Sequence, residues 1–171
     1  MSAAVELRLG RAEVEALLPH RPPLLLVEAV EKYAAEGPEL WCSYPVPEGA
    51  PVLAGHFPGR PIWPGTYTIE GLAQACALAL IVDAIARGDG EPDLAARIRA
   101  RCERPGSAGA LFLVNVGVKL VRPVLPGDRL DYRVRATHRL DALCRLETSA
   151  LVRGGEVAVG RLTVAGEGTP R

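Results

Sequence analysis

The chain has 171 residues, of which 49% are hydrophobic, and its 20 Lys and Arg residues balance its 20 Asp and Glu residues to a formal net charge of zero. This length fits a single domain with a substantial buried core, and the zero net charge gives no polybasic signal for nucleic acid or for an anionic membrane surface. The function must therefore come from a site and not from a charged surface.

The cysteines and the first residues indicate the compartment. Cys42, Cys76, Cys102 and Cys144 are widely spaced without a CxxC pair, and the start of the chain lacks the basic and then apolar layout of a signal peptide. We therefore expect free thiols in a reducing cytoplasm. The most apolar run, 72–82, is too short to cross a bilayer, which needs about 20 residues, so no membrane span is expected.

The first part of the chain reads as a short helix and two strands. Residues 12–18 place Val14 and Leu17 on one helical face, and the prolines that follow end this helix. Residues 24–33 alternate in polarity toward their end and are interpreted as a strand, although their Leu and Glu content also suits a helix. Residues 40–46 give the second strand.

A long helix is predicted over residues 64–86. Pro64 suits the first helical position, and no helix breaker follows before Gly88. Apolar side chains leave this helix no broad polar face, so we expect it to be covered on most sides.

The remaining chain is predicted to be mostly strand. Residues 87–109 are rich in Gly, Pro and Arg and are expected to form a mobile excursion, with a helical turn at 94–102. Four strand-like runs follow, at 111–121, 128–139, 142–153 and 156–165, and the tail from 166 to 171 is expected to be frayed. The order of elements predicts one α+β domain over residues 1–171, with an antiparallel sheet curled around the long helix.

Two ionisable residues flank the start of that helix. His56 lies between Gly55 and the run Phe57, Pro58 and Gly59, so its ring sits on a constrained turn, where it can also serve the turn alone. Glu70 lies near the start of the helix, where a role with the helix dipole is the alternative. Because the helix is expected to be buried, we predict a raised pKa for the carboxyl of Glu70, as a general acid requires.

Two neighbours complete this stretch. Gln74 lies one helical turn beyond Glu70 and either orients that carboxyl or pairs with nearby backbone. Gly65 supplies an unsatisfied N–H at the helix start and, having no side chain, allows close approach of a substrate oxygen. An imidazole, a carboxyl and an oxyanion donor therefore occur within one stretch.

Other chemistries fit the sequence poorly. There is no HExxH zinc motif, no GxSxG elbow, no GxGxxG after a strand and no phosphate-binding GKS. His20 and His138 have no Cys or carboxylate cluster beside them, and we interpret both as surface or packing residues.

Three segments together resemble a known family. LLPHRPPLLLVEAV (17–30), GHFPGRPIWPG followed by IEGLAQA (55–75) and RPVLPGD (122–128) are similar to the motifs of the FabZ-type 3-hydroxyacyl-[acyl carrier protein] dehydratases, which have the hot-dog fold. The resemblance implies that His56 and Glu70 are the catalytic pair and that Gly65 helps bind the thioester oxygen. Glu instead of Asp at position 70 favours the FabZ type over the FabA type.

The resemblance also implies partners and cofactors. The substrate would arrive on the phosphopantetheine arm of acyl carrier protein, and no metal or redox cofactor would be needed. The active sites would be shared in a homodimer, with His from one subunit facing Glu from the other, and dimers can assemble into a trimer of dimers. Arginines that could meet the acidic carrier, or else be merely solvated, are Arg60, Arg122 and the cluster Arg97, Arg99, Arg101 and Arg104.

The sequence departs from the family pattern beside the catalytic groups. Trp63 stands where relatives commonly carry Met or Leu, and Thr66 and Tyr67 replace aliphatic residues. A pocket reshaped for shorter, branched, aromatic or polyene chains is one explanation, and ordinary core packing is the other. The expected pathway is fatty acid biosynthesis or a specialised polyketide or polyene pathway. The expected substrate-binding residues are Phe57, Trp63, Pro64, Thr66, Tyr67 and Gln74.

Two alternatives share the fold. A hot-dog acyl thioesterase would use a helix carboxylate but does not need the imidazole of His56. A non-catalytic acyl-thioester-binding protein would not need to keep both His56 and Glu70.

Overall fold

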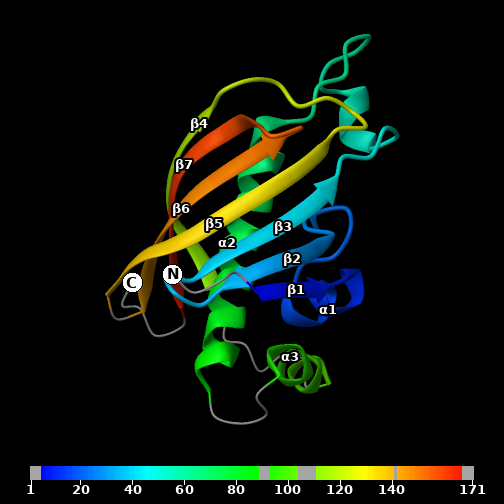
Figure 1. Ribbon diagram of the computed structural model, residues 1–171. Helices are drawn as coiled ribbons and strands as arrows, with labels where there is room; N and C mark the ends of the chain where they lie inside the picture. Colours follow the sequence, from blue (N-terminus) through cyan, green and yellow to red (C-terminus); the bar gives the residue numbers. More distant parts are fainter. Residues whose placement is uncertain (1–4, 89–92, 104–110, 141, 167–171) are drawn as a thin grey trace.

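The computed structural model describes residues 5–88, 93–103, 111–140 and 142–166. A long helix, α2 (Gly65–Arg87), lies against one face of an antiparallel sheet that curls around it (Figure 1). The other helices are α1 (Arg11–Leu17), α3 (Leu94–Cys102) and the short 3-10 helix η1 (Pro51–Ala54). The strands are β1 (Val5–Leu9), β2 (Ala29–Ala34), β3 (Glu39–Pro45), β4 (Leu111–Leu120), β5 (Arg129–Leu140), β6 (Leu143–Val152) and β7 (Gly155–Gly166). The predicted α+β architecture is confirmed.

The seven strands follow the order β1-β2-β3-β5-β6-β7-β4. β5, β6 and β7 form a meander, and the β6–β7 turn places Arg153 and Gly154 at positive φ angles of 51° and 77°. Two positive φ values are what a tight hairpin turn requires, which explains Gly154. Among the described residues β4 pairs with β7 alone, so its other edge has no partner strand there.

Helix α2 supplies the centre of the core. It contacts β3, β4, β5, β6 and β7, and its closest approach is at Gly71, where an added Cβ would lie 2.2 Å from Oη of Tyr132. α2 is long and apolar enough to cross a membrane by length and composition, and 56% of its most apolar window is buried inside the protein. The burial by the sheet explains its apolar character.

The side of α2 that faces away from the sheet is only half covered. Glu70, Ala73, Ala77 and Leu80 are partly buried and follow one another at helical spacing, with exposed Thr66 one turn before them. Residues three and four apart share a helix face, so Glu70 lies on a half-exposed, otherwise apolar stripe. Within the chain this stripe has no complete cover.

The predicted second element is only half a strand. The strand begins at Ala29, and the backbone before it bonds to a side chain of α2: the N–H of Leu26 donates to Gln74 Oε1 and the carbonyl of Leu24 accepts from Gln74 Nε2. β1 was not predicted at all; it pairs with β2 at the outer edge of the sheet.

The middle of the predicted excursion is ordered. Residues 94–102 form α3, whose N-terminus is capped by the side chain of Asp93, and its Ile98 is fully buried where α3 meets α1 and α2. The helical turn predicted at 94–102 is therefore found, as the complete helix α3. Residues 89–92 and 104–110 of the excursion and residues 167–171 of the tail lie outside the described residues.

Candidate active site

The His56 turn holds its imidazole in one orientation. The carbonyl of His56 accepts a hydrogen bond from the N–H of Ile62, and Nδ1 of His56 lies 2.8 Å from the carbonyl oxygen of Ile62. Because a carbonyl can only accept, the proton of a neutral His56 is assigned to Nδ1 and the lone pair to Nε2. The ring also stacks on Phe57, with 4.1 Å between centroids. His56 is thereby arranged as a base at Nε2.

A cavity of about 310 Å³ opens between the His56 turn, the start of α2 and the end of β4. Gly65 lies in its wall as the first residue of α2, and no described residue accepts a hydrogen bond from its N–H. An added Cβ at Gly65 would stand 2.3 Å from Cδ1 of Leu120, so a side chain at this position would require Leu120 to move. The cavity is lined by His56, Ile62, Trp63, Gly65, Thr68, Leu120, Val121, Arg122, Pro123, Val124 and Val157.

Trp63 forms a buried wall of this cavity. Its side chain is 3% exposed, meets Tyr67 edge to face at 5.3 Å and lies 5.9 Å from the ring of Tyr44. Its backbone N–H donates to the carbonyl of Val124, which ties the cavity wall to the chain after β4. Thr68, also buried, lines the cavity and was missed in the sequence; its position one helical turn after Gly65 is the signal that could have found it.

Glu70 does not line this cavity. Its Oε1 lies 2.9 Å from Nε2 of Gln74 and 3.4 Å from Nε2 of His20. Within a single chain, the cavity is therefore lined by His56, Trp63 and Gly65. Glu70 and Gln74 lie elsewhere on α2, outside the cavity lining.

The expectation of a raised pKa for this carboxyl is wrong. The hydrogen bond from His20, helped by the one from Gln74, lowers the pKa of Glu70 although partial burial opposes this change. Burial is the weaker effect because the side chain is still 31% exposed. His20, interpreted as a surface or packing residue, is 30% exposed and contacts Glu70.

Gln74 fulfils both roles that its position allowed. Its side chain is almost fully buried and contacts Glu70, the carbonyl of Leu24 and the N–H of Leu26 at 2.7 to 2.9 Å. It therefore connects Glu70 to the chain before β2.

The other predicted binding residues surround these groups unequally. Phe57 is exposed beside the His56 ring, Pro64 is buried as the N-cap residue of α2, Tyr67 is half-buried against Trp63, and Thr66 is exposed.

The candidate carrier-binding arginines are also scattered. Arg60 is exposed on the His56 turn, and the guanidinium of Arg122 donates to the carbonyls of Glu156 and Val152. The arginines of α3 lie at the far end of α2, which spans about 35 Å at 1.5 Å per residue, whereas the cavity is at its start. Arg104 lies outside the described residues.

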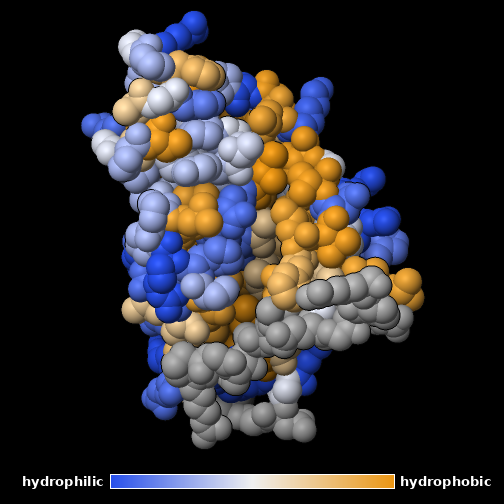
Figure 2. Space-filling view, turned by 180° about the vertical axis from the view of Figure 1, so that it is seen from behind, coloured by the Kyte–Doolittle hydropathy of each residue, from blue (hydrophilic) through white to orange (hydrophobic). Residues whose placement is uncertain are grey.

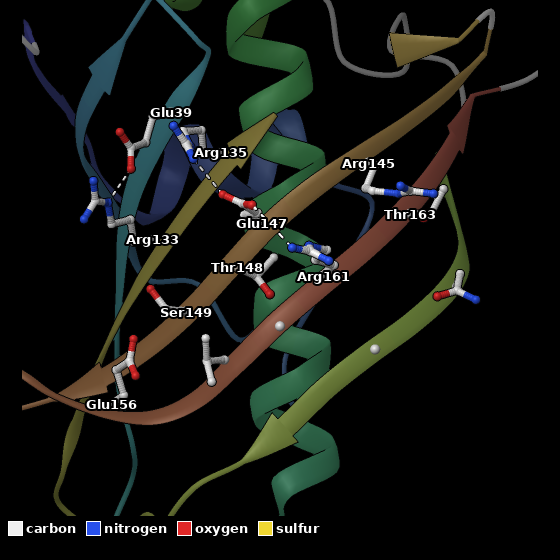
Figure 3. Close-up of a pocket in the computed structure, with 14 residues that line it drawn as sticks. Glu39, Arg133, Arg135, Arg145, Glu147, Thr148, Ser149, Glu156, Arg161 and Thr163 are labelled. Carbon is white, nitrogen blue, oxygen red and sulfur yellow. Dashed lines mark hydrogen bonds and ion pairs between the residues drawn. The ribbon is translucent and has the colours of Figure 1, made fainter. Parts of the chain in front are cut away.

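A larger hollow of about 920 Å³ lies on the outer face of the sheet (Figure 3). Its charges largely satisfy one another: Arg133 pairs with Glu39, and Glu147 pairs with Arg135 at 2.7 Å and more distantly with Arg161. Its lining contains no His or Cys. Among the described residues no group of three or more His, Cys, Asp and Glu side chains could hold a metal ion.

Comparison with known proteins gives concordant matches. The profile of the FabA-like domain matches residues 18–161. The 3-hydroxyacyl-[acyl-carrier-protein] dehydratase FabZ of an Anaeromyxobacter species is 37% identical over 147 residues, covering 85% of this chain and 82% of that protein. The FabZ of Bordetella pertussis is 33% identical over 149 residues, covering 86% and 89%.

A solved structure shows the same fold. The dehydratase heterocomplex ApeI:P from Xenorhabdus doucetiae superposes with a TM-score of 0.64 at 19% identity, covering 91% of each chain. A sheet wrapped around one long helix is the hot-dog fold that the resemblance implied. By its matched domain and its relatives, the chain belongs to the FabA-like family and, within it, to the FabZ-type dehydratases.

Proposed function

We propose that the protein removes water from a (3R)-3-hydroxyacyl thioester carried on acyl carrier protein and forms the trans-2-enoyl thioester, in cytoplasmic fatty acid biosynthesis or a specialised polyketide or polyene pathway. The observation that supports this most is the cavity that both His56 and Gly65 line, with Nδ1 of His56 held by the carbonyl of Ile62. A base and an oxyanion donor on one cavity are what abstraction of a proton next to a thioester carbonyl requires.

The first half of the reaction uses the cavity groups. The thioester oxygen accepts a hydrogen bond from the N–H of Gly65, which stabilises the negative charge that develops there. Nε2 of His56 takes the proton from C2, and the electron pair of that C–H bond moves toward the carbonyl. The thioester is itself the electron sink, so the proposal needs no metal or redox cofactor.

The second half needs a proton donor. Glu70 in its protonated form gives a proton to the C3 hydroxyl, the C3–O bond breaks, and water leaves as the C2–C3 double bond forms. His56 ends protonated and Glu70 ionised, so a net proton transfer from His56 to Glu70 restores the enzyme. The phosphopantetheine arm of the carrier would deliver the acyl chain.

A second copy of the chain would bring Glu70 to the cavity. The open edge of the sheet carries exposed apolar side chains, and Figure 2 shows a broad hydrophobic area on that side of the molecule. Glu70 lies on the half-covered stripe of α2. Exposed apolar patches of this kind mark interfaces, so we propose a homodimer with shared active sites, which can assemble further into a trimer of dimers. The exposed large apolar side chains of β4 are Phe112, Leu113, Val114, Val116 and Leu120.

A turnover assay tests the reaction. The purified protein is given 3-hydroxyacyl thioesters of several lengths on acyl carrier protein, and enoyl formation and free thiol release are followed together. Enoyl formation without thiol release is expected. Thiol release alone would identify a thioesterase, and neither signal would identify a binding protein; both outcomes reject the proposal.

Mixing two inactive variants tests the shared sites. His56→Ala and Glu70→Gln are each expected to lower kcat by at least about 100-fold, the scale of general acid–base catalysis. In a heterodimer of the two, one site keeps both intact groups and the other has neither. Subunit exchange in an equal mixture is therefore expected to restore roughly a quarter of the wild-type activity. No recovery after verified exchange would contradict the shared site.

A further inference from the structure

We propose that His20 is a positioning residue for Glu70, which it holds through Nε2 so that the second carboxyl oxygen, Oε2, is presented to the substrate. This inference rests on the proposed function for its catalytic meaning, and on the described contacts for its geometry.

Both neighbours of the carboxyl meet the same oxygen. Nε2 of Gln74 lies 2.9 Å from Oε1 of Glu70, and Nε2 of His20 lies 3.4 Å from that atom. No described residue contacts Oε2. The His20 distance is long for a hydrogen bond, but catalytic contacts commonly shorten when substrate and partner are bound. Two donors on one oxygen fix the carboxyl plane and leave the other oxygen available.

The protonation of the His20 ring follows from its surroundings. Nδ1 of His20 is buried and has no hydrogen-bond partner within the described part of the chain. A proton on Nδ1 would be a buried donor without an acceptor, which is costly, whereas a proton on Nε2 is shared with Glu70. We therefore assign the neutral ring with its proton on Nε2, aimed at the carboxyl.

The segment that carries His20 is tied down on both sides. The guanidinium of Arg21 donates to the carbonyls of Leu18 and His20 at 2.9 and 2.7 Å. After His20, the chain is bound to Gln74 through the hydrogen bonds at Leu24 and Leu26. His20 is therefore held against α2 by contacts independent of its own ring.

His20 is the one titratable group among the described residues that contacts Glu70. Gln74, from the same helix, is neutral, and Arg21, from the same segment as His20, turns its charge toward carbonyls. In the proposed dimer His56 of the partner subunit is added to this environment.

This arrangement matters when Glu70 releases its proton. The carboxyl then becomes a carboxylate, and the N–H groups of His20 and Gln74 stabilise the new charge on Oε1. The lowered pKa of Glu70 is consistent with this effect. Stabilising the carboxylate lowers the protonated fraction of Glu70 near neutral pH, so the benefit of His20 to catalysis lies in the fixed plane of the carboxyl, which directs the proton of Glu70 to the C3 hydroxyl.

The test compares His20→Leu, which removes the donor, with His20→Gln, whose amide retains an N–H. The titration of Glu70 is followed by carbon-13 NMR of the glutamate carboxyls in the full-length protein, with the Glu70 signal assigned by Glu70→Gln. His20→Leu is expected to raise the pKa of Glu70 and to lower kcat about tenfold or more with little change in KM, as expected for lost orientation. His20→Gln is expected to bring both the pKa of Glu70 and kcat most of the way back to the wild-type values.

A matched control is His138→Leu, which removes an exposed imidazole of β5 and is expected to change neither quantity. An unchanged Glu70 titration in folded His20→Leu would overturn the proposal. If His20→Leu does not fold, His20→Gln is compared with His20→Asn, whose shorter side chain is not expected to bring its amide to Glu70. Equal pKa values of Glu70 in these two variants would overturn the proposal. The NMR titration does not depend on catalysis. If the wild-type protein has no dehydratase activity but His20→Leu still shifts the pKa of Glu70, the proposed function is rejected and the contact between His20 and Glu70 is retained.

Discussion

Trp63 is a buried lining residue of the cavity beside His56. Its indole is buried between Tyr44 and Tyr67 while lining the cavity, so it is at once part of the core and part of the wall. A smaller side chain there should open space for additional methylene groups of the acyl chain.

We predict that Trp63→Leu changes the preferred chain length. The ratio of kcat/KM for a long acyl chain to that for a short one is expected to rise by about tenfold or more, the scale of a few methylene groups in an apolar pocket. Measurement of kcat/KM over a series of 3-hydroxyacyl chains checks this. Tyr67→Phe, which keeps the ring that meets Trp63, serves as the control. An unchanged ratio would assign Trp63 to core packing alone.

The pH dependence of stability follows from the lowered pKa of Glu70. A carboxyl with a lower pKa in the folded state than in the unfolded state stabilises the fold at pH values above its pKa in the unfolded state. This contribution is lost as the pH falls through the pKa of the carboxyl in the folded state. We predict that the difference in unfolding free energy between wild type and Glu70→Gln is largest at neutral pH and shrinks on acidification. Denaturant unfolding across that pH range measures it, and a growing difference would contradict the sign.

The residues of this site were predictable to different degrees. His56, Gly65 and Glu70 could be found because one short stretch contains them and carries a recognisable motif. His20 could not be assigned, because its contact with Glu70 spans fifty positions of chain and depends on how the segment before β2 folds back on α2. The predicted direction of the shift in the Glu70 pKa was wrong for the same reason. The sequence pattern indicated burial of the helix, but it did not indicate that His20 contacts the carboxyl.

Two buried tyrosines differ in how they meet helix α2. Tyr33 of β2 donates from its hydroxyl to Oδ1 of Asp83 at 2.9 Å, at the C-terminal half of the helix. Tyr132 of β5 is also fully buried, but its hydroxyl has no partner within the described residues and faces Gly71. Removal of the hydroxyl group should therefore change the free energy of unfolding by different amounts at the two positions.

We predict that Tyr33→Phe lowers the free energy of unfolding by about 1–3 kcal/mol, because it leaves a buried carboxylate oxygen with one donor fewer. Tyr132→Phe is expected to be neutral within about 0.5 kcal/mol or slightly stabilising, since no hydrogen bond is lost. Denaturant unfolding of the two variants side by side checks the contrast. Equal losses would show that Tyr132 has a partner in the assembled protein.

The secondary structure was predictable where its signals are local. Pro64 and Gly88 delimit α2 to within one residue, and Gly154 marks the last hairpin. The first strand and the start of β2 depend on distant partners: β1 needs the edge of β2, and the backbone of Leu24 and Leu26 bonds to the side chain of Gln74. Long-range hydrogen bonds of this kind leave no local pattern.

The whole chain presents an incomplete surface along β4. One edge of this strand is unpaired, and its apolar side chains are exposed although the sheet elsewhere alternates between buried and exposed positions. Edge strands of soluble proteins are usually protected against pairing, so an unprotected one indicates a partner.

We predict that Val116→Asp separates the dimer. Val116 is exposed on β4, and a carboxylate there would be buried without a counter-charge on assembly, which should raise the dissociation constant by more than about 100-fold. Light scattering after size-exclusion chromatography measures the mass, and the turnover assay measures activity, which is expected to fall with it. Leu140→Asp, at an exposed position at the end of β5, is the control. A fully active monomer would refute the shared site.

Leu120 belongs both to the exposed edge of β4 and to the wall of the cavity beside Gly65. In the proposed dimer, covering the edge of β4 and completing the cavity would therefore occur together. Turnover per chain should depend on protein concentration: well below the dissociation constant of the dimer, the total rate should increase with the square of the concentration, and above it in simple proportion. Dilution alone should then silence the enzyme reversibly, without unfolding any subunit.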